Sequence, residues 1–115
     1  MTYLDVHPSL GGTTEVLFDT INVATAGDNE ILAAPPATKR IVVVHYLLNP
    51  QGAVNLYWRD GAGGAALCGT LAFGAAGFLE VSYRDGVLGT SDGTALVLNL
   101  SAVVQVSGHI AYLLV

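Results

Sequence analysis

The chain has 115 residues, of which 52% are hydrophobic and only 11% are charged, whereas charged residues make up about 25% of an ordinary soluble domain. This length fits a single domain with one core. The net charge of −5, with only four cationic residues, excludes the basic surface that direct binding to DNA or RNA requires.

The apolar surplus predicts self-association. A monomer of this size buries only about two-thirds of the surface that its unfolded chain exposes, and the mean hydropathy of +0.56 leaves few charged side chains to cover the remainder. No apolar run approaches the roughly 20 residues of a membrane-spanning helix, so a membrane is not an expected partner. No Lys or Arg precedes Lys39, and we therefore expect no secretory signal peptide. We therefore expect other copies of the chain to bury this apolar surface.

The first 14 residues are expected to form an extended N-terminal arm. Pro8, Gly11 and Gly12 interrupt this segment, and no periodic pattern persists through it. Such an arm is ordered only where something holds it. Residues 15–115 are expected to form one folded domain.

Short strand-like segments separated by turn residues follow the arm. The turns include Gly27-Asp28-Asn29, Asp60-Gly61 and Asp92-Gly93, and the two Asp-Gly pairs favour tight hairpins because Gly adopts positive φ at little cost. The predicted strands, in chain order, are Glu15–Ala24, Glu30–Ala34, Arg40–Asn49, Ala53–Asp60, Ala66–Ala72, Phe78–Tyr83, Thr94–Leu100 and Val103–Leu114. No substantial helix is predicted, because no helical period continues without interruption. About eight strands at this spacing predict an all-β, antiparallel β-sandwich with a jelly-roll-like arrangement.

The strand Arg40–Asn49 differs from its neighbours because both of its faces are apolar. Strict alternation places Val42, Val44, Tyr46 and Leu48 on one face, and Ile41, Val43, His45 and Leu47 on the other. A sandwich strand has one core face, so the second must meet a loop, another sheet or a neighbouring subunit. We expect the neighbour, with Ile41, Val43, His45 and Leu47 at the interface.

No constellation of residues predicts catalysis. The histidines His7, His45 and His109 are too far apart in the sequence to meet through local structure, so a metal site would have to be assembled by the fold or by symmetry. The single Cys68 allows no disulfide within one chain and is expected to be a small apolar residue of a strand or loop. We expect no enzyme activity, no cofactor and no bound metal.

The stretch from about Val23 to Val115 resembles a family of small β-proteins encoded among the virion genes of tailed bacteriophages. The resemblance rests on a series of short phrases, which are Ala26-Gly27-Asp28-Asn29, Lys39-Arg40-Ile41, Gly52-Ala53-Val54 before Trp58-Arg59, Ala95-Leu96 through Asn99-Leu100-Ser101, and Val104-Gln105-Val106-Ser107-Gly108-His109 with Tyr112. It implies a capsid decoration, or cement, protein that trimerises on the outside of a phage head. Such a protein would be made in the host cytoplasm and would have itself and the major capsid protein as partners. The resemblance implies no catalytic residues for this chain.

Two functional hypotheses follow. In the first, trimers clamp neighbouring capsid subunits, and the N-terminal arm contacts the shell through Tyr3, Leu4, His7, Pro8 and Leu10. In the second, the domain binds a receptor or a glycan on a phage tail or fibre, because exposed aromatic rings beside charged groups suit sugars. The candidate patch for that ligand is Tyr57, Arg59, Tyr83 and Asp85.

Overall fold

The structure is a computed structural model, and it describes residues 15–115. The described chain is all-β. Its strands are β1 (Leu17–Val23), β2 (Gly27–Leu32), β3 (Ile41–Pro50), β4 (Val54–Asp60), β5 (Leu71–Phe73), β6 (Leu79–Ser82), β7 (Leu88–Gly89), β8 (Leu96–Leu100) and β9 (Val106–Leu114). No helix in this part of the chain is long and apolar enough to cross a membrane.

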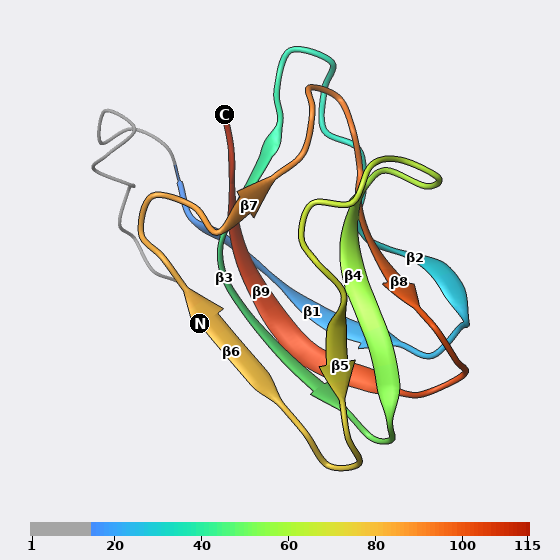
Figure 1. Ribbon diagram of the computed structural model, residues 1–115. Coiled ribbons are helices and arrows are strands. Elements are labelled where there is room, and N and C mark those ends of the chain that lie inside the picture. Colours follow the sequence, from blue (N-terminus) through green and yellow to red (C-terminus); the bar gives the residue numbers. More distant parts are fainter. Residues whose placement is uncertain (1–14) are drawn as a thin grey trace.

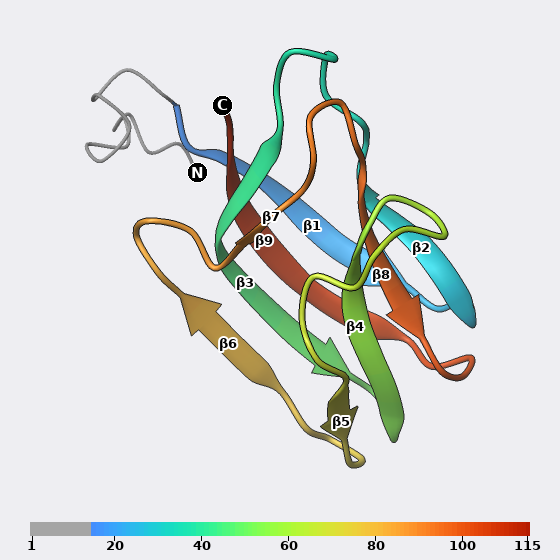
Figure 2. The same ribbon diagram turned by 45° about the horizontal axis from the view of Figure 1, so that its top comes forward.

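The strands form two antiparallel sheets that face each other (Figure 1). One sheet has the order β1-β9-β3-β6, with the short β7 also paired to β3, and the other has the order β2-β8-β4-β5. When the eight strands other than β7 are numbered 1 to 8, these orders become 1-8-3-6 and 2-7-4-5, which is the jelly-roll arrangement. The predicted all-β sandwich is therefore confirmed. Figure 2 shows the two layers from a second direction, with β6 and β5 at the same side of the sandwich.

The core lies between the sheets and comes from the alternating strands that the sequence predicts. Val54, Leu56 and Trp58 of β4 point inward and are at most 4% exposed. The Trp58 ring contacts Tyr46 of the facing sheet edge-on, with 5.2 Å between the ring centroids. Burial raises the pKa of the Tyr46 hydroxyl, because the charged phenolate would lose its hydration there. Contacts of this kind join the two sheets into one folded unit.

A β-bulge in β3 changes which of its side chains face the core. Val43 pairs with Tyr112 of β9, but the next paired residue of β3 is His45, opposite Ala111. Val44 is thus an extra residue on β3. The expectation that Ile41, Val43, His45 and Leu47 share one face is therefore wrong, because a bulge shifts the alternation by one residue. The core face of β3 consists of Ile41, Val43, Tyr46 and Leu48.

The second strand also begins earlier than predicted. Gly27, Asp28 and Asn29, which the sequence suggests as a turn, belong to β2. The reversal of the chain comes just before them, and the Asn29 side chain Nδ2 donates to the carbonyl oxygens of Thr25 at 2.7 Å and Gly27 at 3.1 Å. These bonds hold the connection between β1 and β2 against the start of β2, so Asn29 supports a reversal that ends three residues before it.

Candidate functional site

The outer face of the five-stranded sheet holds a cluster of two histidines and a glutamate. Leu47 of β3 pairs with His109 of β9 on one side and with Glu80 of β6 on the other. Side chains of directly paired residues lie on the same face, so His109 and Glu80 flank Leu47 on the outside of the sandwich. His45 reaches this face because the bulge places it opposite Ala111.

The three polar groups meet at the His45 ring. Its Nε2 atom lies 3.0 Å from Nε2 of His109 and 3.6 Å from Oε2 of Glu80. The two imidazole planes are inclined by 21°. The His109 residue is exposed, whereas the His45 side chain is 22% exposed and that of Glu80 is 58% exposed. We call these three residues the histidine cluster.

Apolar side chains occupy another part of the same outer face. Val42, Val44, Ala111 and Leu113 form a second apolar cluster, against which Val16 and Val115 pack. These four residues are at most 8% exposed. The connection from β6 to β7 passes beside Val42, since a Cβ atom built on Gly86 would lie 2.8 Å from a methyl group of that valine. The second apolar face of β3 is thus largely covered within the chain, whereas the apolar pattern of the strand predicts a neighbouring subunit there.

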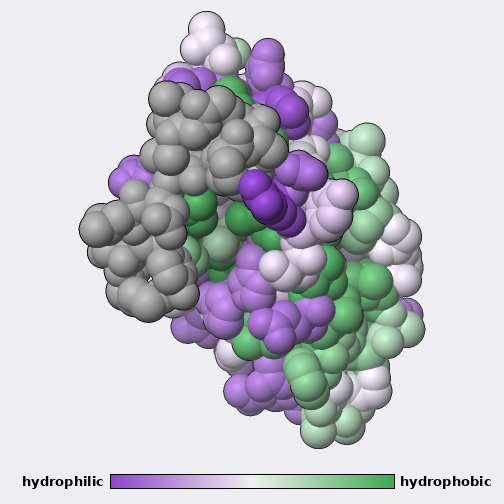
Figure 3. Space-filling model, turned by 90° about the vertical axis from the view of Figure 1, so that its left-hand side faces the viewer, coloured by the Kyte–Doolittle hydropathy of each residue, from purple (hydrophilic) through white to green (hydrophobic). Residues whose placement is uncertain are grey.

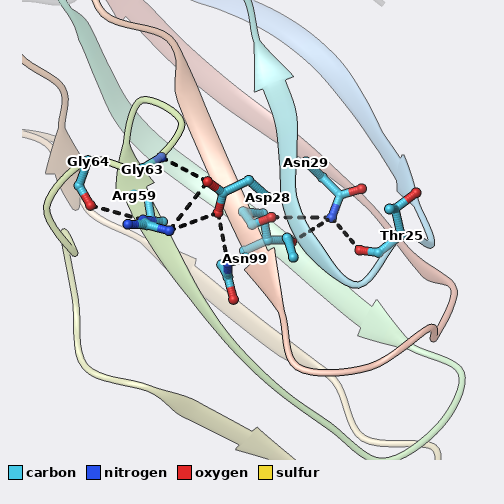
Figure 4. A network of polar contacts seen from close by, with 9 residues as sticks. Thr25, Asp28, Asn29, Arg59, Gly63, Gly64 and Asn99 are labelled. Carbon is cyan, nitrogen blue, oxygen red and sulfur yellow. Dashed lines mark hydrogen bonds and ion pairs between the residues drawn. The ribbon is translucent and has the colours of Figure 1, made fainter.

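The four-stranded sheet carries a polar network on its outer face (Figure 4). Asp28 of β2 accepts hydrogen bonds from Asn99 Nδ2 of β8 at 2.7 Å, from the Gly63 backbone N–H at 2.9 Å, and from Arg59 of β4. Arg59 also donates from Nε to the carbonyl oxygen of Gly64 at 2.9 Å. We call Asp28, Arg59 and Asn99 the aspartate network. Its hydrogen bonds hold the loop around Gly63 against the sheet.

The aspartate network stabilises the ionised form of Asp28. The hydrogen bond from Asn99 is the largest of the influences that lower the pKa of this carboxyl, followed by the Gly63 N–H, and the Arg59 guanidinium adds to them. Donors that point at a carboxylate favour its charged form. Because Arg59 and Asn99 are both engaged with Asp28, the network is a structural tie between three strands and a loop.

Apolar side chains are exposed at the end of the sandwich that holds the β5–β6 turn. Leu71, Phe73, Phe78 and Leu79 line an open hollow of about 360 Å³ there. Phe78 is 70% exposed. Figure 3 shows hydrophobic side chains gathered toward this end of the molecule. We call Leu71, Phe73, Phe78 and Leu79 the apolar end.

The structure separates the residues predicted for a subunit interface. Ile41 and Val43 are fully buried in the core, and only His45 and Leu47 lie on the outer face. The predicted capsid contacts Tyr3, Leu4, His7, Pro8 and Leu10, and the arm to which they belong, lie outside the described residues.

The structure does not bring the four residues of the predicted ligand patch together. Tyr57 and Arg59 belong to β4 of the four-stranded sheet, where the guanidinium lies 5.8 Å from the centre of the Tyr57 ring. Tyr83 and Asp85 follow β6 of the five-stranded sheet. Arg59 is already bound to Asp28. These four residues therefore form no common surface for a sugar.

Sequence reasoning missed both polar clusters. His45 and His109 are 64 residues apart in the sequence, and they meet only because β3 and β9 are neighbours in this particular register. Asp28 and Asn99 pair across β2 and β8, whereas the sequence suggested a turn at Asp28. The signal available in the sequence was the even spacing of polar residues in strands with an outward face, such as Ser107 and His109, but pairing register is needed to use it. Cys68 is a free, partly buried thiol that packs against the core.

Comparison with known proteins adds little to this description. No family model matches the chain, and no curated protein matches it. Among solved structures, the chain is similar to one described as "Bacillus endospore appendages form a novel family of disulfide-linked pili", with 12% sequence identity and a TM-score of 0.44, over 90% of this chain and 89% of that chain. A similarity of this size does not indicate what the present chain binds or does.

Proposed function

We propose that the protein is a structural component of a phage particle that associates with copies of itself and decorates the outside of the capsid. The observation that carries self-association is the apolar end, where Phe78 is 70% exposed beside an apolar hollow. Contiguous exposed apolar surface of this kind is typical of protein–protein contacts. The phage setting rests on the sequence resemblance of residues 23–115.

A second copy of the chain is the occupant that the composition favours for the apolar end. Only 11% of the residues are charged, so a chain of this kind has few alternatives to burying apolar surface against itself. Burying that surface stabilises an assembly by about 25 cal/mol per Å² before the costs of ordering are subtracted. Closed symmetry with three copies, as the resemblance implies, would place the apolar ends together around an axis.

The oligomeric state tests self-association. Light scattering on the purified chain should give a mass of three copies, and Phe78→Ser should shift the population toward smaller species, because it removes an apolar ring from the contact. Tyr83→Ser is a matched control, since Tyr83 is also an exposed aromatic residue, at 59%, but lies at the other end of β6. A wild-type chain that stays at 11.9 kDa at all concentrations would refute the proposal.

Electron microscopy tests the capsid location separately. An antibody against the chain should label the outer shell of phage heads in particles that contain it. Label confined to the tail or fibre would overturn the capsid location and leave the self-association result unchanged. That result would favour a receptor- or glycan-binding role on a tail or fibre, with a ligand surface other than Tyr57, Arg59, Tyr83 and Asp85.

A further inference from the structure

We propose that the histidine cluster binds a divalent transition-metal ion such as Zn²⁺. His45 and His109 present Nε2 atoms 3.0 Å apart, and both atoms can act as metal ligands when the imidazoles are neutral. In the metal-free form, one ring must donate its Nε2–H to the lone pair of the other. A bound ion would replace that shared proton and would use both lone pairs.

The spacing of the two nitrogen atoms is close to what zinc requires. Ligand atoms about 2.0–2.1 Å from a tetrahedral zinc ion are about 3.3 Å from each other. The Nε2 atoms of His45 and His109 would therefore need to separate by only a few tenths of an ångström. The surrounding backbone is held in place by the β3–β9 ladder, which runs without a break from His45–Ala111 to Pro50–Val106. Small rotations of the two rings are enough to admit an ion.

Glu80 supplies the third ligand by a movement of its side chain. Its Oε2 atom lies 3.6 Å from Nε2 of His45, and its side chain is 58% exposed. Among residues 15–115, no three histidine, cysteine or carboxylate side chains are already close enough together to hold an ion. Rotation of Glu80 toward the imidazole pair would complete a set of two histidines and one glutamate, which binds zinc with a fourth position open to water.

The chemistry of the ligands selects the class of ion. Imidazole nitrogens suit Zn²⁺, Ni²⁺ and Cu²⁺, whereas Mg²⁺ and Ca²⁺ prefer sets made only of oxygen ligands. The net charge of −5 also favours a cation near the chain. Because the histidine cluster lies on the outer face of the sheet, an ion bound there would be accessible from solvent or from a neighbouring chain.

Titration calorimetry with ZnCl₂ on the full chain tests the proposal, with native mass spectrometry to count the ions. We expect one Zn²⁺ per chain. His109→Gln and His45→Gln should each weaken binding by at least tenfold, and Glu80→Gln by a smaller factor, because losing even a hydrogen-bonding partner of a metal ligand typically reduces metal affinity by about 10–100-fold.

Two matched variants control for general effects of removing such side chains. Glu30→Gln removes an exposed carboxylate from β2 of the opposite sheet, and His7→Gln removes the remaining histidine of the chain; both should leave zinc binding unchanged. Circular dichroism should show that the variants fold. In addition, NMR of the wild-type chain should show that Zn²⁺ shifts the imidazole ¹⁵N signals of both His45 and His109.

Three outcomes would overturn the metal site. One is the absence of a mass increase and of heat on adding Zn²⁺ to the wild-type chain. Another is binding that His7→Gln removes and His109→Gln retains. The last is a wild-type NMR spectrum in which Zn²⁺ leaves both imidazoles unchanged, which needs no variant and so does not depend on whether a variant folds.

Discussion

The two sheets of the sandwich use their outer faces differently. The five-stranded sheet buries apolar side chains on both sides, because Val42, Val44, Ala111 and Leu113 form a cluster behind the core. The four-stranded sheet has one apolar face, and its outer face carries the aspartate network. The five-stranded sheet is thus apolar on its inner face and on part of its outer face, beside the histidine cluster, whereas charged and polar side chains hold the outer face of the four-stranded sheet together. The difference begins in β3. The bulge at Val44 shifts the alternation of this strand, so that some of its apolar side chains face the core and others face outward.

The largest expected effect comes from crowding the junction of β9 and β3. Gly108 has φ of +155°, and a Cβ atom built on it would lie 1.8 Å from the carbonyl oxygen of Leu47. Gly108→Ala therefore forces the strands of the five-stranded sheet apart, and we expect it to lower the free energy of unfolding by about 4 kcal/mol or more. Urea denaturation at fixed protein concentration measures this loss.

A glycine in open space provides the control for that prediction. A Cβ atom on Gly69 would have no neighbour within 4 Å, so Gly69→Ala should change the free energy of unfolding by less than about 1 kcal/mol. Equal effects of the two substitutions would mean that β9 and β3 are not packed as closely as the structure places them.

A matched pair of leucines compares the two apolar layers directly. Leu98 and Leu113 are both fully buried, but Leu98 belongs to the main core, which has 14 buried residues among those described, and Leu113 to the outer cluster, which has four. Leu98→Ala should cost about 4 kcal/mol and Leu113→Ala about 2 kcal/mol, because a small layer collapses more easily around a cavity. Equal costs in urea denaturation would show that the outer cluster is as rigid as the core.

The sequence predicted the fold well and the polar clusters poorly. Alternation in Val54, Leu56 and Trp58 indicated the core face of β4, because side chains of a strand alternate strictly while its pairing is regular. The same rule failed in β3, where the extra Val44 breaks the alternation. No local pattern distinguishes a bulged valine from a regular one in an apolar run, since both are favourable in strands.

Contacts between distant strands were beyond the reach of local patterns. His45 and His109 come together only when β3 and β9 are adjacent and in register, and register is set by the packing of the whole sheet.

The residues of the turns were more informative than those of the strands. Gly61 and Gly86 end the two similar phrases Trp58-Arg59-Asp60-Gly61 and Tyr83-Arg84-Asp85-Gly86, and both have positive φ, of 78° and 111°. Only glycine tolerates such angles easily, so these turns are fixed by residue type alone.

The smallest expected effect concerns the aspartate network. Asp28→Asn removes the charge that Arg59 and Asn99 bind, and we expect it to lower the free energy of unfolding at pH 7 by about 1 kcal/mol, the size of a partly exposed ion pair with its hydrogen bonds. Asp92→Asn, at an exposed turn residue, is the matched control and should have little effect.

The pH dependence of that loss identifies its cause. The pKa of Asp28 is lower in the folded chain than the ordinary value of 3.8, chiefly because of the hydrogen bond from Asn99. A carboxyl with a lowered folded pKa adds stability that is complete above its unfolded pKa and is lost as the pH falls through the folded one. The difference in the free energy of unfolding between wild type and Asp28→Asn should therefore stay constant from about pH 7 to about pH 5, and it should disappear as the pH falls below about 4. A difference that persists at lower pH would show that Asp28 acts through shape and packing, and the charge of the aspartate network would then not be what stabilises the four-stranded sheet.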